Sequence, residues 1–245
     1  MGGSVAAVPN SVAHSMVANL FPAIAERYGL GDLRGATRMV SRYLLFVAAF
    51  VLPMSTFFLV EAPRLVRFWL HNSYPLIEVA VRLMTVAFTL RALAMIPWRV
   101  SWGFGRPQDS SVAMTLNLSV LAGGGAALLI SSAFSYRGIL IVCVASWLVS
   151  TLYLCWCMSR SLPAVFSVDN AWLFWALLKV TVLAITAGAL HCLVGRLLPI
   201  GEVFPLLLDG VILSLCYLAV FLWAIPKAEK TALTKLLRVR SRRRT

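Results

Sequence analysis

The charged stretch FPAIAERYGLGDLRGATRMVSRYLLF, residues Phe21–Phe46, decides the fold because it interrupts a chain that is otherwise apolar. Its charged residues are Glu26, Arg27, Asp32, Arg34, Arg38 and Arg42. Apolar runs flank these residues on both sides. Gly29, Gly31 and Gly35 allow the backbone to turn, because glycine adopts conformations that other residues avoid. We therefore predict a turn between two helices over residues 26–42, hereafter the elbow.

The composition places the chain in a membrane. Hydrophobic residues make up 60% of it and charged residues 13%, against ~45–50% and ~25% in soluble globular domains. A soluble fold of this length could not cover so much apolar surface, because a large part of any folded surface stays exposed. No sustained alternation of apolar and polar residues suggests a β-barrel. We predict an all-α integral membrane protein.

Several segments are apolar and long enough to cross a bilayer, which takes ~20 residues. They are Tyr43–Val60, Ile77–Pro97, Val112–Ser132, Ile139–Met158, Ala171–Val194 and Phe204–Ile225. A further helix, Ser11–Tyr28, carries polar residues such as His14 and Asn19 on about half of its circumference. It has no basic residue before Arg27, which disfavours a helix lying on the membrane surface. We predict about seven transmembrane helices, the first lining a cavity.

Basic residues choose the orientation of such a bundle. Alternate loops divide them unequally, with fifteen in the set that contains the elbow and the C-terminal end, and four in the other set. We predict a multi-pass protein of the cell inner (cytoplasmic) membrane, with the elbow and the C-terminus cytoplasmic. The net charge of +13 then indicates contact with anionic headgroups of the lipid bilayer rather than with nucleic acid.

Enzymatic patterns find little support in this sequence. It has nine acidic residues in all, with no clustered carboxylates, HExxH or GxSxG motif, so we predict no catalytic residues and no enzyme. The cysteines lie within apolar runs, without histidines at metal-ligand spacing, and are interpreted as packing residues. We expect no metal site, no cofactor and no cleaved signal peptide.

Four stretches, in this order, carry a resemblance to a known family. They are LFPAIAERYGLGDLRGATRMVSRYL (Leu20–Leu44), EAPRLVRFWLHNSYP (Glu61–Pro75), WGFGRPQDSSVAMTLNL (Trp102–Leu118) and SYRGILIVCVASW (Ser135–Trp147). Together they resemble the elbow, external loop, inner loop and sixth-helix start of polysaccharide and lipid-linked oligosaccharide flippases. These flippases belong to the multidrug/oligosaccharidyl-lipid/polysaccharide exporter (MATE-like) superfamily.

The resemblance implies a domain plan and a function. Residues 1–160 would form the later five helices of one MATE-like lobe, residues 161–226 an appended transmembrane hairpin, and residues 227–245 a basic cytoplasmic tail. The implied activity is translocation of a polyprenyl-phosphate-linked glycan for cell-surface polysaccharide biosynthesis. Family members have two six-helix lobes that rock against each other, so this chain would be a fragment, would pair with a second chain, or would no longer transport.

Two other functions stay open at this point. One is a cation-coupled multidrug exporter of the same superfamily, which wants an acidic residue deep in the cavity. Asp209 is a poor candidate because it falls in the appended hairpin. The other is a truncated membrane partner of glycan-assembly enzymes that does not itself transport.

Ionisable residues at bilayer depth are the candidates for a substrate site, because they are costly to bury. The candidates are Arg91, Lys179 and Arg82 in predicted spans, with His14 and Asn19 on the first helix. Arg91 is predicted to attract a phosphate, whereas Arg82 lies one turn after Glu78 and can pair with it. Asn117 is predicted to hydrogen-bond a neighbouring helix, and residues 123–125 (Gly-Gly-Gly) to allow close helix packing or a local bend.

Overall fold

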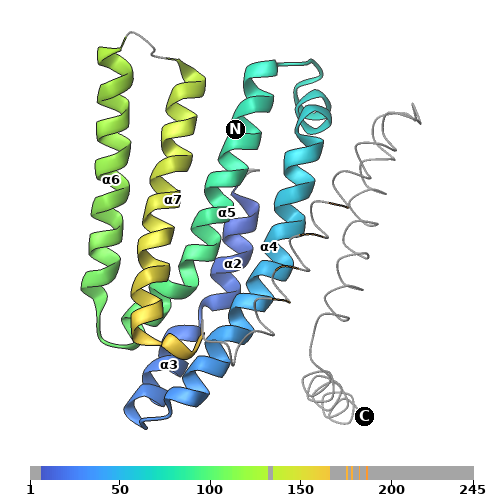
Figure 1. Ribbon diagram of the computed structural model, residues 1–245. Helices are drawn as coiled ribbons and strands as arrows, with labels where there is room; N and C mark the ends of the chain where they lie inside the picture. Colours follow the sequence, from blue (N-terminus) through green and yellow to red (C-terminus); the bar gives the residue numbers. More distant parts are fainter. Residues whose placement is uncertain are drawn as a thin grey trace, which may run out of the picture.

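The computed structural model describes residues 7–131 and 135–165, together with Trp175, Leu178, Val182 and Thr186. This part of the chain forms helices and no strand. The helices are α2 (Val8–Val17), α3 (Leu20–Gly29), α4 (Leu33–Leu70), α5 (Pro75–Gly103), α6 (Pro107–Ile130) and α7 (Tyr136–Ser161), followed by a 3-10 turn at Pro163–Val165. Figure 1 shows α4, α5, α7 and α6 side by side, with α3 at one end.

The predicted class of all-α multi-pass membrane protein agrees with this architecture. Four helices of the described part, α4 to α7, are long and apolar enough to cross a membrane. The prediction of about seven spans is not supported. The first predicted span is broken, and the last two, Ala171–Val194 and Phe204–Ile225, fall outside the described residues apart from the isolated positions named above.

The predicted helix Ser11–Tyr28 is two helices. Helix α2 ends at Val17, α3 begins at Leu20, and Ala18 and Asn19 form a turn between them. Pro22 supplies a physical reason: it has no N–H, so it cannot donate to the carbonyl of Ala18 and continue a single helix through this point. Proline is tolerated in the first turn of a helix, which is where the structure places it.

Helix α4 is longer than the sequence suggests. It contains 38 residues, whereas the predicted span ends at Val60 and assigns the following residues to an external loop. The helix continues through Glu61 because its next turns still face a partner. Ala62 and Val66 are buried against Val81 of α5, and such packing stabilises a helix beyond its most apolar stretch. It ends at Leu70, followed by His71 in a left-handed conformation, with φ 52°.

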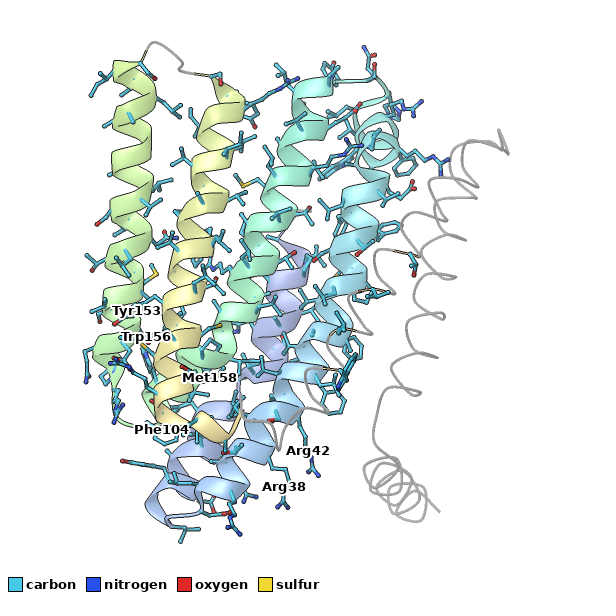
Figure 2. All side chains as sticks on the ribbon, viewed as in Figure 1. Arg38, Arg42, Phe104, Tyr153, Trp156 and Met158 are labelled. Atoms are coloured by element: carbon cyan, nitrogen blue, oxygen red, sulfur yellow. The ribbon has the colours of Figure 1, made fainter. Side chains whose placement is uncertain are left out.

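The main hydrophobic core lies at the elbow end of the bundle. Residues from α2, α3, the first half of α4, the last part of α5 and the end of α7 meet there. Figure 2 places Phe104 and Met158 at this end, close to the level of Arg38 and Arg42. Helix α5 is the common neighbour, since it packs against α2, α3, α4 and α7. The core therefore fixes the elbow to the bundle.

Helices α6 and α7 form a pair joined by a polar bond and a close contact. The Nδ2 of Asn117 donates to the Oγ of Ser146 at 3.2 Å, and both residues are buried. This confirms the predicted bond from Asn117 to a neighbouring helix. Gly124 faces Val142 so closely that a Cβ would lie 2.6 Å from Cγ1 of that valine. Close packing is thus confirmed for Gly124, although Gly123 and Gly125 face open space.

Replacing Gly124 or Gly123 by alanine should affect the stability of the folded protein differently. We expect Gly124→Ala to lower the thermal unfolding temperature of the detergent-solubilised protein, because overpacking against Val142 costs ~1–3 kcal/mol. Gly123→Ala should be neutral or stabilising, since alanine favours a helix over glycine by ~1 kcal/mol and meets no neighbour. Equal effects of the two substitutions would contradict the close α6–α7 contact.

Candidate functional site

The elbow is a tight turn built by glycine and aspartate. Helix α3 ends at Gly29, and the next peptide N–H, at Leu30, donates to the carbonyl of Glu26 at 3.1 Å. Gly31 has φ 70°, a left-handed conformation that suits glycine because it has no Cβ. Asp32 then caps α4: its Oδ1 accepts from the backbone N–H of Gly35 at 2.8 Å. The predicted turn is confirmed, but it is shorter than predicted: only residues 30–32 lie between the two helices, and residues 33–42 belong to α4.

An ion pair closes the turn over Gly35. The Nη1 of Arg27 donates to Oδ2 of Asp32 at 2.6 Å, although both side chains remain partly exposed. A Cβ on Gly35 would overlap the Asp32 carboxylate and the Arg27 guanidinium, so only glycine leaves room for the pair. The Gly35 N–H, followed by the Arg27 guanidinium, holds the pKa of the Asp32 carboxyl below its usual value.

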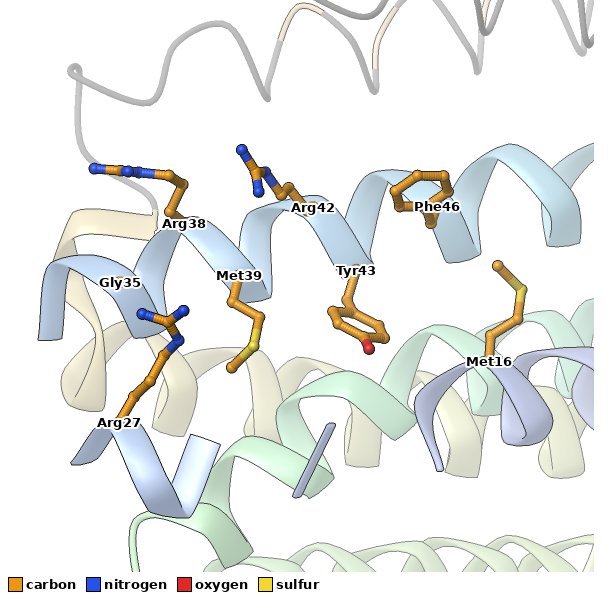
Figure 3. A pocket seen from close by; sticks show the side chains of 8 residues that line it. All are labelled: Met16, Arg27, Gly35, Arg38, Met39, Arg42, Tyr43 and Phe46. Atoms are coloured by element: carbon orange, nitrogen blue, oxygen red, sulfur yellow. The ribbon is translucent and has the colours of Figure 1, made fainter. Parts of the chain in front are cut away.

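A cavity of about 510 Å³, hereafter the elbow pocket, lies between α4 and the two short helices. It is lined by Met16, Arg27, Gly35, Arg38, Met39, Arg42, Tyr43 and Phe46. Figure 3 shows Arg27 pointing from α3 toward Gly35 and Met16 pointing from α2 toward α4. Residues that are distant in sequence thus meet around one space.

The spacing of the residues on α4 gives the pocket two chemical characters. Arg38, Arg42 and Phe46 recur every four residues and share one face of the helix, whereas Met39 and Tyr43 lie on the next face. In Figure 3 the two arginines project from a different side of α4 than Met39 and Tyr43. Both arginines are exposed, so they form a cationic rim beside a largely apolar lining.

Aromatic contacts hold α3 against the C-terminal end of α5. Phe21 meets Trp102 edge to face with ring centroids 6.3 Å apart, and Tyr28 lies 4.6 Å from Phe104. Such pairs contribute ~0.5–1.5 kcal/mol beyond the area that they bury. Gly103 completes the contact, because a Cβ there would meet the side chain of Ile24 at 2.5 Å. The elbow and the predicted inner loop therefore form one unit.

Arg91 is the predicted site residue with the most distinctive surroundings. It lies twelve residues before the end of α5, or ~18 Å at 1.5 Å per residue, so it falls well inside the span. Its Cζ is 5.1 Å from the centre of the Trp147 ring on α7. Its Nε is buried and has no hydrogen-bond partner among the described residues. A permanent cation thus keeps an unsatisfied donor within the membrane.

Hydroxyl groups near Arg91 in sequence join the neighbouring helices. The Oγ1 of Thr89 donates to Oγ of Ser55 on α4 at 2.6 Å. On the other side, Oγ1 of Thr151 on α7 lies 3.3 Å from the carbonyl oxygen of Leu90 and donates to it. Interhelical hydrogen bonds of this kind stabilise transmembrane bundles modestly. They fix the section of α5 that carries Arg91 between α4 and α7.

The other predicted site residues do not gather around Arg91. The Nε of Arg82 donates to the carbonyl of Leu59 at 3.2 Å, and no ion pair with Glu78 forms in the described part of the chain. His14 and Asn19 are exposed, and neither lines the elbow pocket. Lys179 lies outside the described residues. The structure therefore gives no common cavity for the set predicted from sequence.

Two features were missed by sequence reasoning. Glu61 was assigned to an external loop, yet it is buried in α4, 3% exposed, with its Oε2 3.5 Å from Nη1 of Arg64. The net charge predicts contact of basic residues with headgroups, but it does not predict a pocket beside the elbow arginines. The four-residue spacing of Arg38 and Arg42 beside Met39 was the signal that a pocket with a cationic rim could form.

Comparison of the chain with known families, curated proteins and solved structures gives no match. Among the described residues, no group of three or more His, Cys, Asp or Glu side chains is placed to hold a metal ion. Arg91, with its buried and unsatisfied Nε, is therefore the residue that points most directly to a function.

The Asp32 cap should open in acid. Because the pKa of this carboxyl is lowered in the folded protein, its stabilising contribution is complete above the unfolded pKa. The contribution is lost as the pH falls through the lower folded value. Hydrogen–deuterium exchange of peptides covering Gly35, corrected for intrinsic rates, should show reduced protection as the pH drops from neutral toward about 2.

The matched control is Asp32→Asn, which keeps an oxygen to accept from Gly35 but cannot ionise. Protection in this variant should be lower at neutral pH and should no longer change in the acidic range. If the wild-type protein loses no protection at the elbow in acid, the ionised cap is not what holds the turn.

Proposed function

We propose that this chain takes part in translocating a lipid-linked oligosaccharide across the cytoplasmic membrane for cell-surface polysaccharide assembly. The observation that carries the proposal is the unsatisfied Nε of Arg91 inside a spanning helix. A charged group at this depth is costly, and it is retained where it meets a substrate or a charged partner. A guanidinium suits the phosphate groups of a polyprenyl-linked sugar, because its planar fork matches phosphate oxygens.

The surroundings of Arg91 support a role in binding. The Trp147 ring holds the guanidinium by a cation–π contact, at 5.1 Å, that leaves the N–H groups available to an anion. The described residues offer Arg91 no hydrogen bond or ion pair that would occupy those groups. An anionic substrate would therefore gain charge-assisted hydrogen bonds without breaking existing ones.

In this proposal the helices work as part of a two-lobed transporter. The later part of one MATE-like lobe, an appended hairpin and a second lobe, on this chain or another, would together enclose the substrate. Alternating access would come from rocking the lobes, while the lipid tail stays in the bilayer. The helical bundle of the described residues, with its four candidate spans, supports this arrangement.

A cation-coupled exporter is the second candidate, and Glu61 is the observation that favours it. Its carboxylate is the buried acidic group of the described part, as such an exporter would require. Arg64 already lies within 3.5 Å of it, however. A carboxylate with a cationic neighbour is a poorer site for a coupling ion, because the pair is already compensated. Translocation of an anionic lipid therefore ranks first.

Replacing Arg91 by alanine should reduce surface polysaccharide without lowering the amount of protein. Hydrogen bonds to a charged group contribute ~1.5–3 kcal/mol, so the translocation rate should fall about 10- to 100-fold. Arg91→Lys should retain part of the activity, since it keeps the charge and loses the fork. The measurement is surface polysaccharide in a strain that lacks the gene and is complemented with each variant.

Arg137→Ala provides the control for this experiment, because Arg137 is exposed at the start of α7. It removes one positive charge and should leave surface polysaccharide unchanged. Normal polysaccharide with Arg91→Ala at normal protein level would remove Arg91 from the substrate path. Loss of the gene that stops glycan assembly but leaves transbilayer movement of the lipid-linked oligosaccharide unchanged would favour the non-transporting partner of glycan-assembly enzymes.

Glu61→Gln separates the two transport candidates. The variant keeps the size of the side chain but cannot ionise, so lipid translocation should persist, with a lower unfolding temperature from loss of the contact with Arg64. A cation-coupled exporter would instead lose gradient-driven efflux of its substrates. Efflux of a fluorescent organic cation that depends on Glu61, with normal surface polysaccharide, would reverse the ranking of the two functions.

A further inference from the structure

The elbow pocket has a chemistry that the proposed function does not use. Its two rim arginines, Arg38 and Arg42, lie one helical turn apart, or ~6 Å along the axis of α4. Two guanidinium groups at this spacing can converge on one phosphate, to which each offers a planar pair of N–H donors. The rim is therefore suited to a phosphate diester, whose charge is spread over two free oxygens.

Arg27, at the base of the pocket, is already neutralised, which leaves Arg38 as an exposed cation beside it. Arg27 is paired with Asp32 at 2.6 Å and so points its guanidinium at Gly35. Arg38 forms no hydrogen bond or ion pair in the described part of the chain, and it is exposed. An arriving anion would therefore meet Arg38 without displacing a partner of this side chain.

The apolar part of the pocket lining indicates that the bound phosphate belongs to a lipid and is not a free ion. Met16, Met39 and Phe46 line the same 510 Å³ cavity, and Phe46 lies on a helix that can cross the membrane. Phe46 follows Arg38 by eight residues, or ~12 Å toward the interior of the span. A free phosphate ion gains nothing from such a wall, whereas a lipid buries the start of its acyl chains against it.

We infer that the elbow pocket binds the headgroup of an anionic phospholipid from the leaflet that surrounds the elbow end of the bundle. Arg38 and Arg42 bind the phosphate, and Met16, Met39 and Phe46 contact the glycerol and the upper acyl chain. A zwitterionic phosphatidylcholine fits less well, since its choline cation opposes the two guanidinium groups. The site is separate from Arg91 and does not depend on the translocation proposed above.

The test is the thermal unfolding temperature of the purified full-length chain in a mild neutral detergent, titrated with added lipid. Binding to the folded state raises this temperature. Dioleoylphosphatidylglycerol should raise it in a saturable way, and dioleoylphosphatidylcholine should not. Arg38→Gln combined with Arg42→Gln should shift the midpoint of the phosphatidylglycerol titration at least about tenfold to higher concentration, since two charge-assisted contacts are lost.

Arg34→Gln is the matched control for charge. Arg34 is exposed on α4, one turn before Arg38, but does not line the pocket, so this variant should titrate like the wild type. A loss of phosphatidylglycerol binding equal to that of the double variant would show diffuse attraction and overturn the pocket. An unchanged midpoint in the double variant would overturn it as well, and would assign the lipid effect to other basic residues.

Two further measurements complete the test: a competition with inorganic phosphate identifies the ligand, and a second double variant replaces the first if that one does not fold. Inorganic phosphate that competes with phosphatidylglycerol at equal concentration would make a soluble anion the ligand and overturn the lipid assignment; we expect no competition. If the glutamine variant does not fold, Arg38→Lys combined with Arg42→Lys keeps both charges. Its midpoint should still move to higher concentration, because lysine lacks the fork, and an unmoved midpoint would contradict the proposed geometry.

Discussion

The cap that Asp32 places on α4 is the interaction on which the rest of the structure depends. One carboxylate satisfies the Gly35 N–H and the Arg27 guanidinium together, and these two bonds fix the direction in which α4 leaves α3. That direction sets where α4 meets α5, and so where the core at the elbow end closes. Glycine at position 35 is required because a side chain there would occupy the space of the ion pair.

The surroundings of polar side chains differ between the elbow end of the bundle and the middle of its spanning helices. At the elbow end Arg27 and Asp32 are paired, and Arg34, Arg38 and Arg42 are exposed. Further into the spans, hydroxyl and amide groups such as those of Thr89 and Asn117 bond across helices, because lipid offers no partner for them. Arg91 departs from this rule. Its guanidinium contacts an aromatic ring and not a hydrogen-bond acceptor. The Nε–H group therefore remains able to donate to a bound anion.

Hydropathy and glycine positions predicted the spanning helices of the described part and the elbow, because both depend on local composition. Their extent was less predictable. The apolar window ends at Val60, whereas α4 continues because tertiary contacts at Val66 stabilise it. Pro22 explains the break before α3, but the prediction of one helix over Ser11–Tyr28 did not take this proline into account. The elbow pocket could not be derived, because it requires Met16 of α2 to approach α4, and sequence alone does not fix that approach.

The length of α4 has a consequence for how the protein sits in lipid. A straight helix of 38 residues would extend ~57 Å, whereas the hydrocarbon layer is ~30 Å thick and the whole bilayer ~40–45 Å. Pro53 and Pro63 lie inside α4, and its last turns run at an angle to the rest in Figure 1. The helix resolves this mismatch by bending at a proline, by leaning or by protruding, and the angle it takes depends on the thickness of the surrounding membrane. The rim of the elbow pocket is rigidly attached to the start of α4. Membrane thickness therefore sets the height of Arg38 relative to the lipid phosphates.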